Sequence, residues 1–164
     1  MFGFQAASDL TNWKIFNWSW LGDYKIAWIS VVIVSVWQSL GYMMIIYIAG
    51  LQSISTDVLE SAQIDGAVGF RKFWNITLPL IMPAVTICGF FTLAGGLKIF
   101  DIVYVLTNGG PGFSTTSVAQ NIYRESFQNN RYGYGTAQSL IFFIIILVIT
   151  TIQVRVTKKR EVES

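Results

Sequence analysis

Three long, largely apolar stretches of this chain carry no aspartate, glutamate, lysine or arginine. They cover residues 26–56, 73–97 and 132–154. Each stretch can hold the roughly 20 apolar residues that an α-helix needs to cross a hydrocarbon core about 30 Å thick. No water is present there to pair with the backbone, so only helices and closed barrels span a bilayer, and these continuous apolar runs are typical of helices. The sequence therefore predicts an all-α integral membrane protein with three transmembrane helices.

We place the spans at about residues 26–50, 79–97 and 136–154, within a single transmembrane domain that covers residues 1–164. Composition excludes several other classes. Only 12% of the residues are charged, about half the share in soluble domains. The net charge of +2 is too small to indicate a nucleic-acid partner. Histidine, the commonest acid–base catalyst, is absent, and Cys88 is the single cysteine. We predict no catalytic residue, no metal site and no enzymatic activity in this chain.

The distribution of lysine and arginine along the chain predicts its orientation in the membrane. Three spans place the loop 51–78 and the C-terminal tail on one side of the membrane and the loop 98–135 on the other. The first side carries Arg71, Lys72, Arg155, Lys158, Lys159 and Arg160, and the second carries Lys14, Lys25, Lys98, Arg124 and Arg131. The tail cluster directly follows a span, where the bias towards cytoplasmic positive charge acts most strongly. We therefore expect a multi-pass cell-membrane protein with a cytoplasmic loop at 51–78 and an external loop at 98–135.

The predicted cytoplasmic loop has the pattern of a docking element. Thr56 or Asp57 can cap a helix, whose positive end then lies near Asp57 and Glu60. Gly66 permits a backbone conformation that other residues adopt reluctantly, and the amphipathic segment 69–74 follows it. A shallow helix with an acidic start and a fixed elbow suits insertion into the groove of a partner. An amphipathic helix that rests on lipid headgroups is the alternative.

The spacing within this loop is specific. Glu60-Ser61-Ala62 is followed after three residues by Gly66 and after nine more by Ile76-Thr77-Leu78-Pro79. This pattern resembles the EAA motif of permease subunits in binding-protein-dependent ABC importers, with Ser61 in place of an alanine. Further matches to the carbohydrate-uptake branch occur at Thr107 and at Gly109-Gly110-Pro111. The chain resembles the C-terminal half of such a permease, which has six spans.

The resemblance implies a function and a set of partners. Such a permease forms part of a sugar pathway with a second permease subunit, receives sugar from an extracytoplasmic solute-binding protein, and lies in the lipid bilayer. Separate ATP-binding subunits, which hold ATP and Mg²⁺, drive the transport, so we expect no cofactor on this chain. The resemblance assigns contact with the ATP-binding subunit to the coupling residues Glu60, Ser61, Ala62, Asp65, Gly66, Phe70 and Arg71.

Residues of a substrate path are assigned more weakly. The candidates are Gln38, Tyr42, Thr92, Asp101, Gly109, Gly110 and Pro111. Polar side chains inside spans also join helices through hydrogen bonds, Asp101 can pair with Lys98 one helical turn earlier, and the glycine-rich loop can be an ordinary surface turn. A membrane scaffold, or a piece of a secondary transporter or channel, is the alternative function. Three spans do not enclose a sugar pathway, so we expect that this chain alone does not transport.

Overall fold

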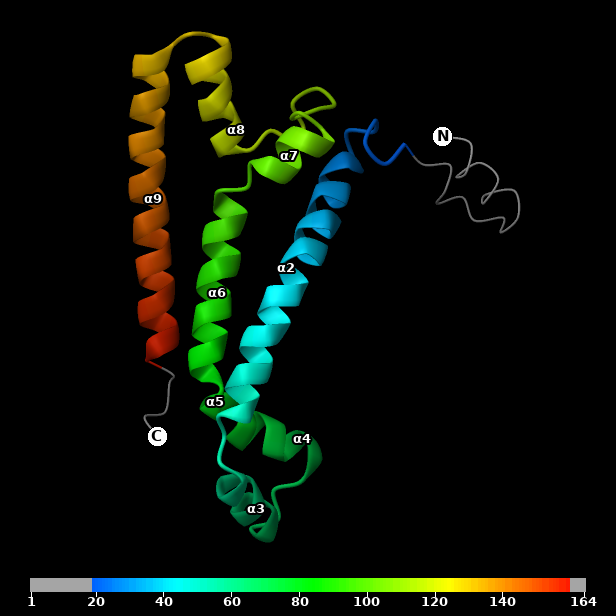
Figure 1. The fold of residues 1–164 in the computed structure, drawn as a ribbon, viewed down its shortest axis with the longest axis vertical. Coiled ribbons are helices and arrows are strands. Elements are labelled where there is room, and N and C mark those ends of the chain that lie inside the picture. The colour runs from blue at the N-terminus through cyan, green and yellow to red at the C-terminus, as the bar shows by residue number, and fades with distance from the viewer. Residues whose placement is uncertain (1–18, 160–164) are drawn as a thin grey trace, which may run out of the picture.

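The computed structural model describes residues 19–159, and every regular element in this part of the chain is helical, which confirms the predicted all-α class (Figure 1). Lys14 and Arg160, used above for orientation, lie outside the described residues. The elements are α2 (Ala27–Gln52), α3 (Thr56–Ile64), α4 (Gly69–Lys72), the π-helical turn η2 (Phe73–Thr77), α5 (Leu78–Leu80), α6 (Met82–Leu97), α7 (Asp101–Leu106), α8 (Val118–Tyr123), the π-helical turn η3 (Arg124–Gln128) and α9 (Tyr132–Lys158).

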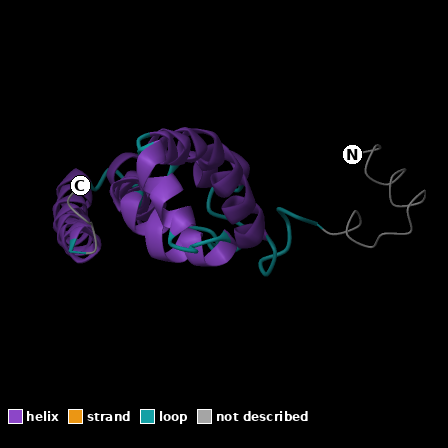
Figure 2. Ribbon diagram, turned by 90° about the horizontal axis from the view of Figure 1, so that it is seen from below, coloured by secondary structure: helices purple, strands orange, loops and turns teal. Residues whose placement is uncertain are grey.

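The long helices α2, α6 and α9 run alongside one another, and α6 packs against both of the others (Figure 1). Seen end-on, α9 stands beside the remaining helices rather than among them (Figure 2). Large apolar side chains point outwards, including Trp37, which is 78% exposed. Within residues 19–159, α2 and α9 are each long and apolar enough to cross a membrane. A surface of large apolar side chains suits the hydrocarbon core of a lipid bilayer.

The second apolar stretch is not one straight helix. The helical segment that ends at Leu80 and the helix that begins at Met82 meet at an angle of 72°. The predicted span therefore differs from the structure, because Pro79 lies before the bend and the straight part begins three residues later. The 16 residues of α6 extend about 24 Å, which is short for a bilayer core of about 30 Å. The bent pair counts as a third membrane span only if its two parts are taken together.

Small residues set the distance between the long helices. A Cβ atom on Gly50 of α2 would lie 2.8 Å from the Cβ atom of Ala84 on α6. A Cβ atom on Gly89 of α6 would lie 2.9 Å from Nε2 of Gln153 on α9. Close approach at small residues is typical of membrane helices, where hydrophobic burial gives no net attraction between apolar surfaces. These two glycines therefore bring α6 against both of its neighbours.

The opposite end from α3 is covered by α7, α8 and η3 (Figure 1). Within the predicted external loop, α8 is followed directly by η3. Neighbouring rings form a continuous row with centroids 5.3–6.2 Å apart: Phe100, Tyr104, Tyr123, Phe127 and Tyr132. A hydrogen bond with Tyr104 raises the pKa of Tyr123 above its ordinary value. Aromatic rows of this kind are common at the interface between membrane and water.

Candidate functional site

The helix α3 begins with a serine cap. The Ser55 side chain accepts a hydrogen bond of 3.3 Å from the backbone N–H of Asp57. The prediction that Thr56 or Asp57 forms the cap is therefore wrong, because Ser55 has the extended conformation of a capping residue and Thr56 is already helical. Asp57 lies in the first turn, where a negative charge is favourable next to the helix dipole. The cap and the charge together define the start of this short helix.

The end of α3 explains the spacing between Ala62 and Gly66. The Gly66 N–H donates to the carbonyl of Gln63 (3.0 Å), and the Ala67 N–H donates to the carbonyl of Ala62 (2.9 Å). This pair of bonds is a Schellman motif, which requires a left-handed residue at the position of Gly66. Gly66 has φ +81°, and no atom lies within 4 Å of the position of its missing Cβ. Glycine is therefore needed here for its backbone and not for lack of space.

The predicted coupling residues lie together at one end of the molecule, below the long helices in Figure 1. Glu60, Ser61, Asp65, Gly66, Phe70 and Arg71 are exposed, and Ala62 is buried. Large apolar side chains accompany them, since Ile64 is 86% exposed, Val68 67% and Phe70 78%. Apolar surface beside charged groups, outside the membrane-length helices, is typical of a protein contact site.

A bent connection joins this contact surface to α6. Val68 precedes α4 and offers no side-chain cap. The π-helical turn η2 follows, with the Trp74 ring 5.8 Å from both Phe70 and Phe73. The axis then turns at Ile81, whose φ and ψ of −91° and 8° leave the helical region. Single π-helical turns are frequent at functional sites, and this one lies between the exposed surface and the start of α6.

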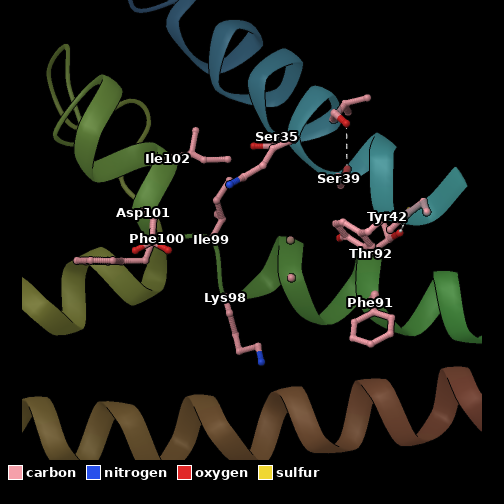
Figure 3. A pocket seen from close by; sticks show the side chains of 15 residues that line it. Ser35, Ser39, Tyr42, Phe91, Thr92, Lys98, Ile99, Phe100, Asp101 and Ile102 are labelled. Atoms are coloured by element: carbon pink, nitrogen blue, oxygen red, sulfur yellow. Dashed lines mark hydrogen bonds between the residues drawn. The ribbon is translucent and has the colours of Figure 1, made fainter. Parts of the chain in front are cut away.

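A cavity of about 540 Å³ opens between α2, α6 and the segment that leads into α7 (Figure 3). Four of the seven predicted substrate-path residues line this cavity: Gln38, Tyr42, Thr92 and Asp101. Gly109, Gly110 and Pro111 do not line it. Its volume lies within the range of about 300–1,000 Å³ typical of small-molecule sites.

The walls of the cavity combine polar and aromatic groups. Tyr42 and Phe91 meet edge to face with ring centroids 6.3 Å apart. The hydroxyl groups of Ser39 and Thr92 donate to carbonyls of their own helices, at 3.0 Å to Val36 and 2.8 Å to Cys88, so their oxygens keep accepting capacity. Sequence reasoning missed Ser35, Ser39 and Lys98 as lining residues. The signal for the serines was available, because Ser35, Ser39 and Tyr42 recur at helical spacing on one face.

The suggested pairing of Asp101 with Lys98 is wrong. Among residues 19–159, no side-chain nitrogen of Lys98 lies within 4.0 Å of the Asp101 carboxylate, whereas Arg131 and Glu125 do form such a pair at 3.1 Å. The two side chains point in different directions (Figure 3). Asp101 instead occupies the first turn of α7, where the helix dipole favours a carboxylate.

The glycine-rich segment at Gly109 and Gly110 forms an ordered loop beyond α7. The Thr115 hydroxyl lies 2.7 Å from that of Thr107 and donates to the carbonyl of Gly110 at 2.8 Å. The Thr116 hydroxyl donates to the carbonyl of Gly109 at 3.2 Å. The loop is therefore held by side chains on both sides of it.

The amino-acid sequence of this chain matches a known protein family. Residues 2–162 match the family described as "Binding-protein-dependent transport system inner membrane component". This chain belongs to that family and is a multi-pass component of the cell (inner) membrane.

Individual relatives refine the comparison. The chain is 43% identical over 162 residues to the "Probable starch degradation products transport system permease protein AmyD" of Thermoanaerobacterium thermosulfurigenes, covering 98% of this chain and 54% of the relative. It is 37% identical to the "Multiple sugar-binding transport system permease protein MsmF" of Streptococcus mutans, covering 98% and 56%. Identity to the "Trehalose/maltose transport system permease protein MalF" of Thermococcus litoralis is 36%, covering 91% and 54%. The chain thus spans about half the length of these relatives.

Proposed function

We propose that this chain forms part of the permease of an ATP-driven importer for sugars, working with a second permease subunit and a solute-binding protein. The three relatives are named for starch degradation products, multiple sugars and trehalose/maltose, which supports a carbohydrate substrate. The family is described as dependent on a binding protein. ATP and Mg²⁺ belong, in this proposal, to separate ATP-binding subunits, because transport by this family member needs an energy source that its own side chains do not provide.

The glycine elbow after α3 carries the proposal. Within it, a left-handed residue and two backbone hydrogen bonds fix the direction in which the chain leaves α3. Glu60 and Ser61 lie exposed on α3, while Phe70 is exposed on α4. An exposed pair of short helices with apolar and acidic side chains suits a groove on an ATP-binding subunit, in the helix-in-groove mode.

The cavity supports a role in the sugar path. A pyranose has an apolar face that packs on aromatic rings, such as those of Tyr42 and Phe91, and hydroxyl groups that need donors and acceptors. Gln38 offers both a donor and an acceptor, and Asp101 offers two acceptor oxygens. The missing part of the wall would come from other spans of the permease.

Co-purification from native membranes tests this function. The complex is solubilised gently from cells that carry either the natural chain or the double variant Glu60→Ala, Gly66→Trp. We expect an ATP-binding subunit to be recovered with the natural chain and lost with the double variant. Gly112→Trp is the matched control, since Gly112 is also left-handed with no atom near its missing Cβ but lies at the opposite end of the molecule.

Other outcomes point to the alternatives. Equal recovery of an ATP-binding subunit with natural chain and double variant would refute the contact through α3. Recovery of unrelated membrane proteins only, unchanged by the double variant, would support a scaffold. Ion flux through the purified natural chain without any ATP-binding subunit would support a channel or secondary transporter.

A further inference from the structure

The loop between α7 and α8 contains a chemically labile pair of residues, Asn108 and Gly109. Asn108 is the one asparagine of the sequence that is followed by glycine. Asparagine is one of the thermolabile residues of proteins. Glycine has no side chain to shield its backbone nitrogen, so in an unfolded chain that nitrogen readily reaches the side-chain carbonyl of the asparagine before it. Asn108 is exposed in the structure, and water therefore has access to it.

The backbone of the loop turns the two reacting groups away from each other. Asn108, Gly109, Gly112 and Phe113 all lie in the left-handed region, with φ of 49°, 84°, 56° and 65°. For an L-residue this region combines such a φ with a ψ of about +30 to +60°. At these angles the Gly109 nitrogen lies on the opposite side of the Cα–C bond from the Asn108 Cβ atom. Attack by that nitrogen therefore requires the Asn108 backbone to rotate out of the left-handed region.

Gln120 and Thr107 hold this backbone in place. Gln120 is 2% exposed, and its Nε2 donates to Oδ1 of Asn108 at 3.3 Å. The N–H of Gly109, whose nitrogen would make the attack, donates to Oγ1 of Thr107 at 3.3 Å. The attacking group and the attacked side chain are thus each bonded to a different residue, and both bonds must break before they can meet.

The side chain of Gln120 is itself packed tightly against the loop. A Cβ atom on Gly109 would lie 2.9 Å from Oε1 of Gln120 and 2.7 Å from Oγ1 of Thr116, so only glycine fits there. The Oε1 atom of Gln120 has no hydrogen-bond partner among the described residues. The amide group therefore restrains the loop through Nε2, and the bond from Nε2 to Asn108 is the one that a substitution removes.

We propose that Asn108 is a site of spontaneous deamidation, and that Gln120 is the positioning residue that restrains the reaction. The Gly109 nitrogen bonds to Cγ of Asn108, the bond from Cγ to Nδ2 breaks, and the amide leaves as ammonia with the proton from Gly109. Water then opens the resulting cyclic imide at either carbonyl, which leaves aspartate or isoaspartate at position 108. This inference does not depend on the proposed function.

The isoaspartyl product cannot take up the same loop structure. It adds one carbon to the main chain before Gly109 and so displaces this glycine, which has no room even for a Cβ atom. The aspartyl product keeps an oxygen that can accept from Nε2 of Gln120. Formation of isoaspartate is therefore a one-way change that leaves the loop unable to close again.

Ageing of the chain in its native membranes tests the restraint. Membranes that carry the natural chain or Gln120→Met are incubated in buffer, and peptide mass spectrometry follows the conversion of Asn108 to both products. Methionine keeps the length of glutamine without its donor. Because the reaction proceeds from the opened loop, its rate follows the population of that form, and loss of one hydrogen bond should speed it about two- to tenfold. Gln128→Met is the matched control, since Gln128 is exposed at the same end of the molecule, and should leave the rate unchanged.

Two further measurements separate the restraint from general stability. In denaturant the natural chain, Gln120→Met and Gln128→Met should all be deamidated at one common rate, faster than in the membrane, because the restraint belongs to the folded loop. Thr107→Val removes the acceptor of the Gly109 N–H and keeps the shape of the side chain. This variant should also speed the reaction in the membrane and leave the rate in denaturant unchanged.

Several results would overturn the inference. No modified Asn108 in denaturant would mean that the site is not labile, and equal rates for the natural chain in membrane and in denaturant would mean that the fold does not restrain it. Equal rates for Gln120→Met and Gln128→Met in the membrane would remove the role of Gln120. So would a Gln120→Met chain that reacts in the membrane as fast as in denaturant, because Gln120 would then hold the whole fold rather than this loop. All of these results leave the proposed function intact.

Discussion

Substitutions of Gly66 separate the effect of its backbone from the effect of its surroundings. Because no atom lies within 4 Å of the position of its missing Cβ, a new side chain causes no clash. What remains is the left-handed backbone at φ +81°, which costs an ordinary L-residue about 1–2 kcal/mol. The order of tolerance should therefore be glycine, then asparagine, then alanine, then valine, since asparagine visits this region most readily and β-branched residues least.

The effect on docking depends on how easily the turn at Gly66 opens, and opening costs the hydrogen bonds that close the end of α3. Opening breaks the two hydrogen bonds of Gly66 and Ala67, worth about 1–3 kcal/mol together. This is close to the cost of the strained backbone, so Gly66→Ala should populate open and closed elbows alike. Docking must then restore the closed form, which weakens binding of the ATP-binding subunit about twofold when the two forms are equally populated, and about sixfold when the open form is favoured by about 1 kcal/mol.

The assay is a binding titration of purified ATP-binding subunit against the permease complex in nanodiscs, for the natural chain and the three variants. We expect Gly66→Asn to stay within about twofold of the natural Kd and Gly66→Ala to raise it about two- to sixfold. Gly66→Val should bind more weakly still. Valine binding as well as asparagine would refute the reasoning, because the side chain would then not act through the backbone conformation.

Two further predictions concern packing and capping. Ser55→Ala should destabilise α3 by about 1 kcal/mol and speed hydrogen exchange in that helix, whereas Thr56→Ala should not; the reverse result would restore the cap first predicted. Gly50→Leu should destabilise the contact between α2 and α6 by about 1–3 kcal/mol through overpacking, because its Cβ meets Ala84, and should lower the thermal unfolding temperature of the detergent-solubilised chain. Gly41→Leu, with no atom within 4 Å, is its control, and equal effects of both changes would contradict this account.

Local chemistry made part of this structure predictable from the sequence. A membrane-length stretch that is both uncharged and continuously apolar predicts a helix, so α2 and α9 follow from composition alone. The left-handed glycine at Gly66 was also predictable, because a helix end of this type is determined within six residues. The row of Gln38 and Tyr42 along one face of α2 likewise follows from helical spacing.

The remaining features depend on contacts between distant residues. Pro79 and Pro83 are both tolerated in a first helical turn, so the pattern does not indicate that the axis bends by 72° between them. Gln120 reads as an ordinary polar residue of a loop helix until it is seen to pack against Gly109, eleven positions earlier. The positive φ of Phe113 has no sequence signal at all, because phenylalanine is disfavoured there.

The bend at Ile81 has a mechanical consequence. The exposed segment with α3 and α4 is joined covalently to α2 at one end and to α6 at the other, so a force applied to it pulls on both helices at once. The helical segment that ends at Leu80 meets α6 at an angle of 72°. A force along that segment therefore acts across the axis of α6 and tilts the helix. No such connection joins α3 and α4 to α9, which packs on α6, where Gly89 and Gln153 meet, and on α8 and η3 at the opposite end. In the proposed coupling, α2 and α6 move with the docked segment through their covalent links, and α9 moves through its packing contacts. Loosening the contact between α6 and α9 would then let α6 move without α9.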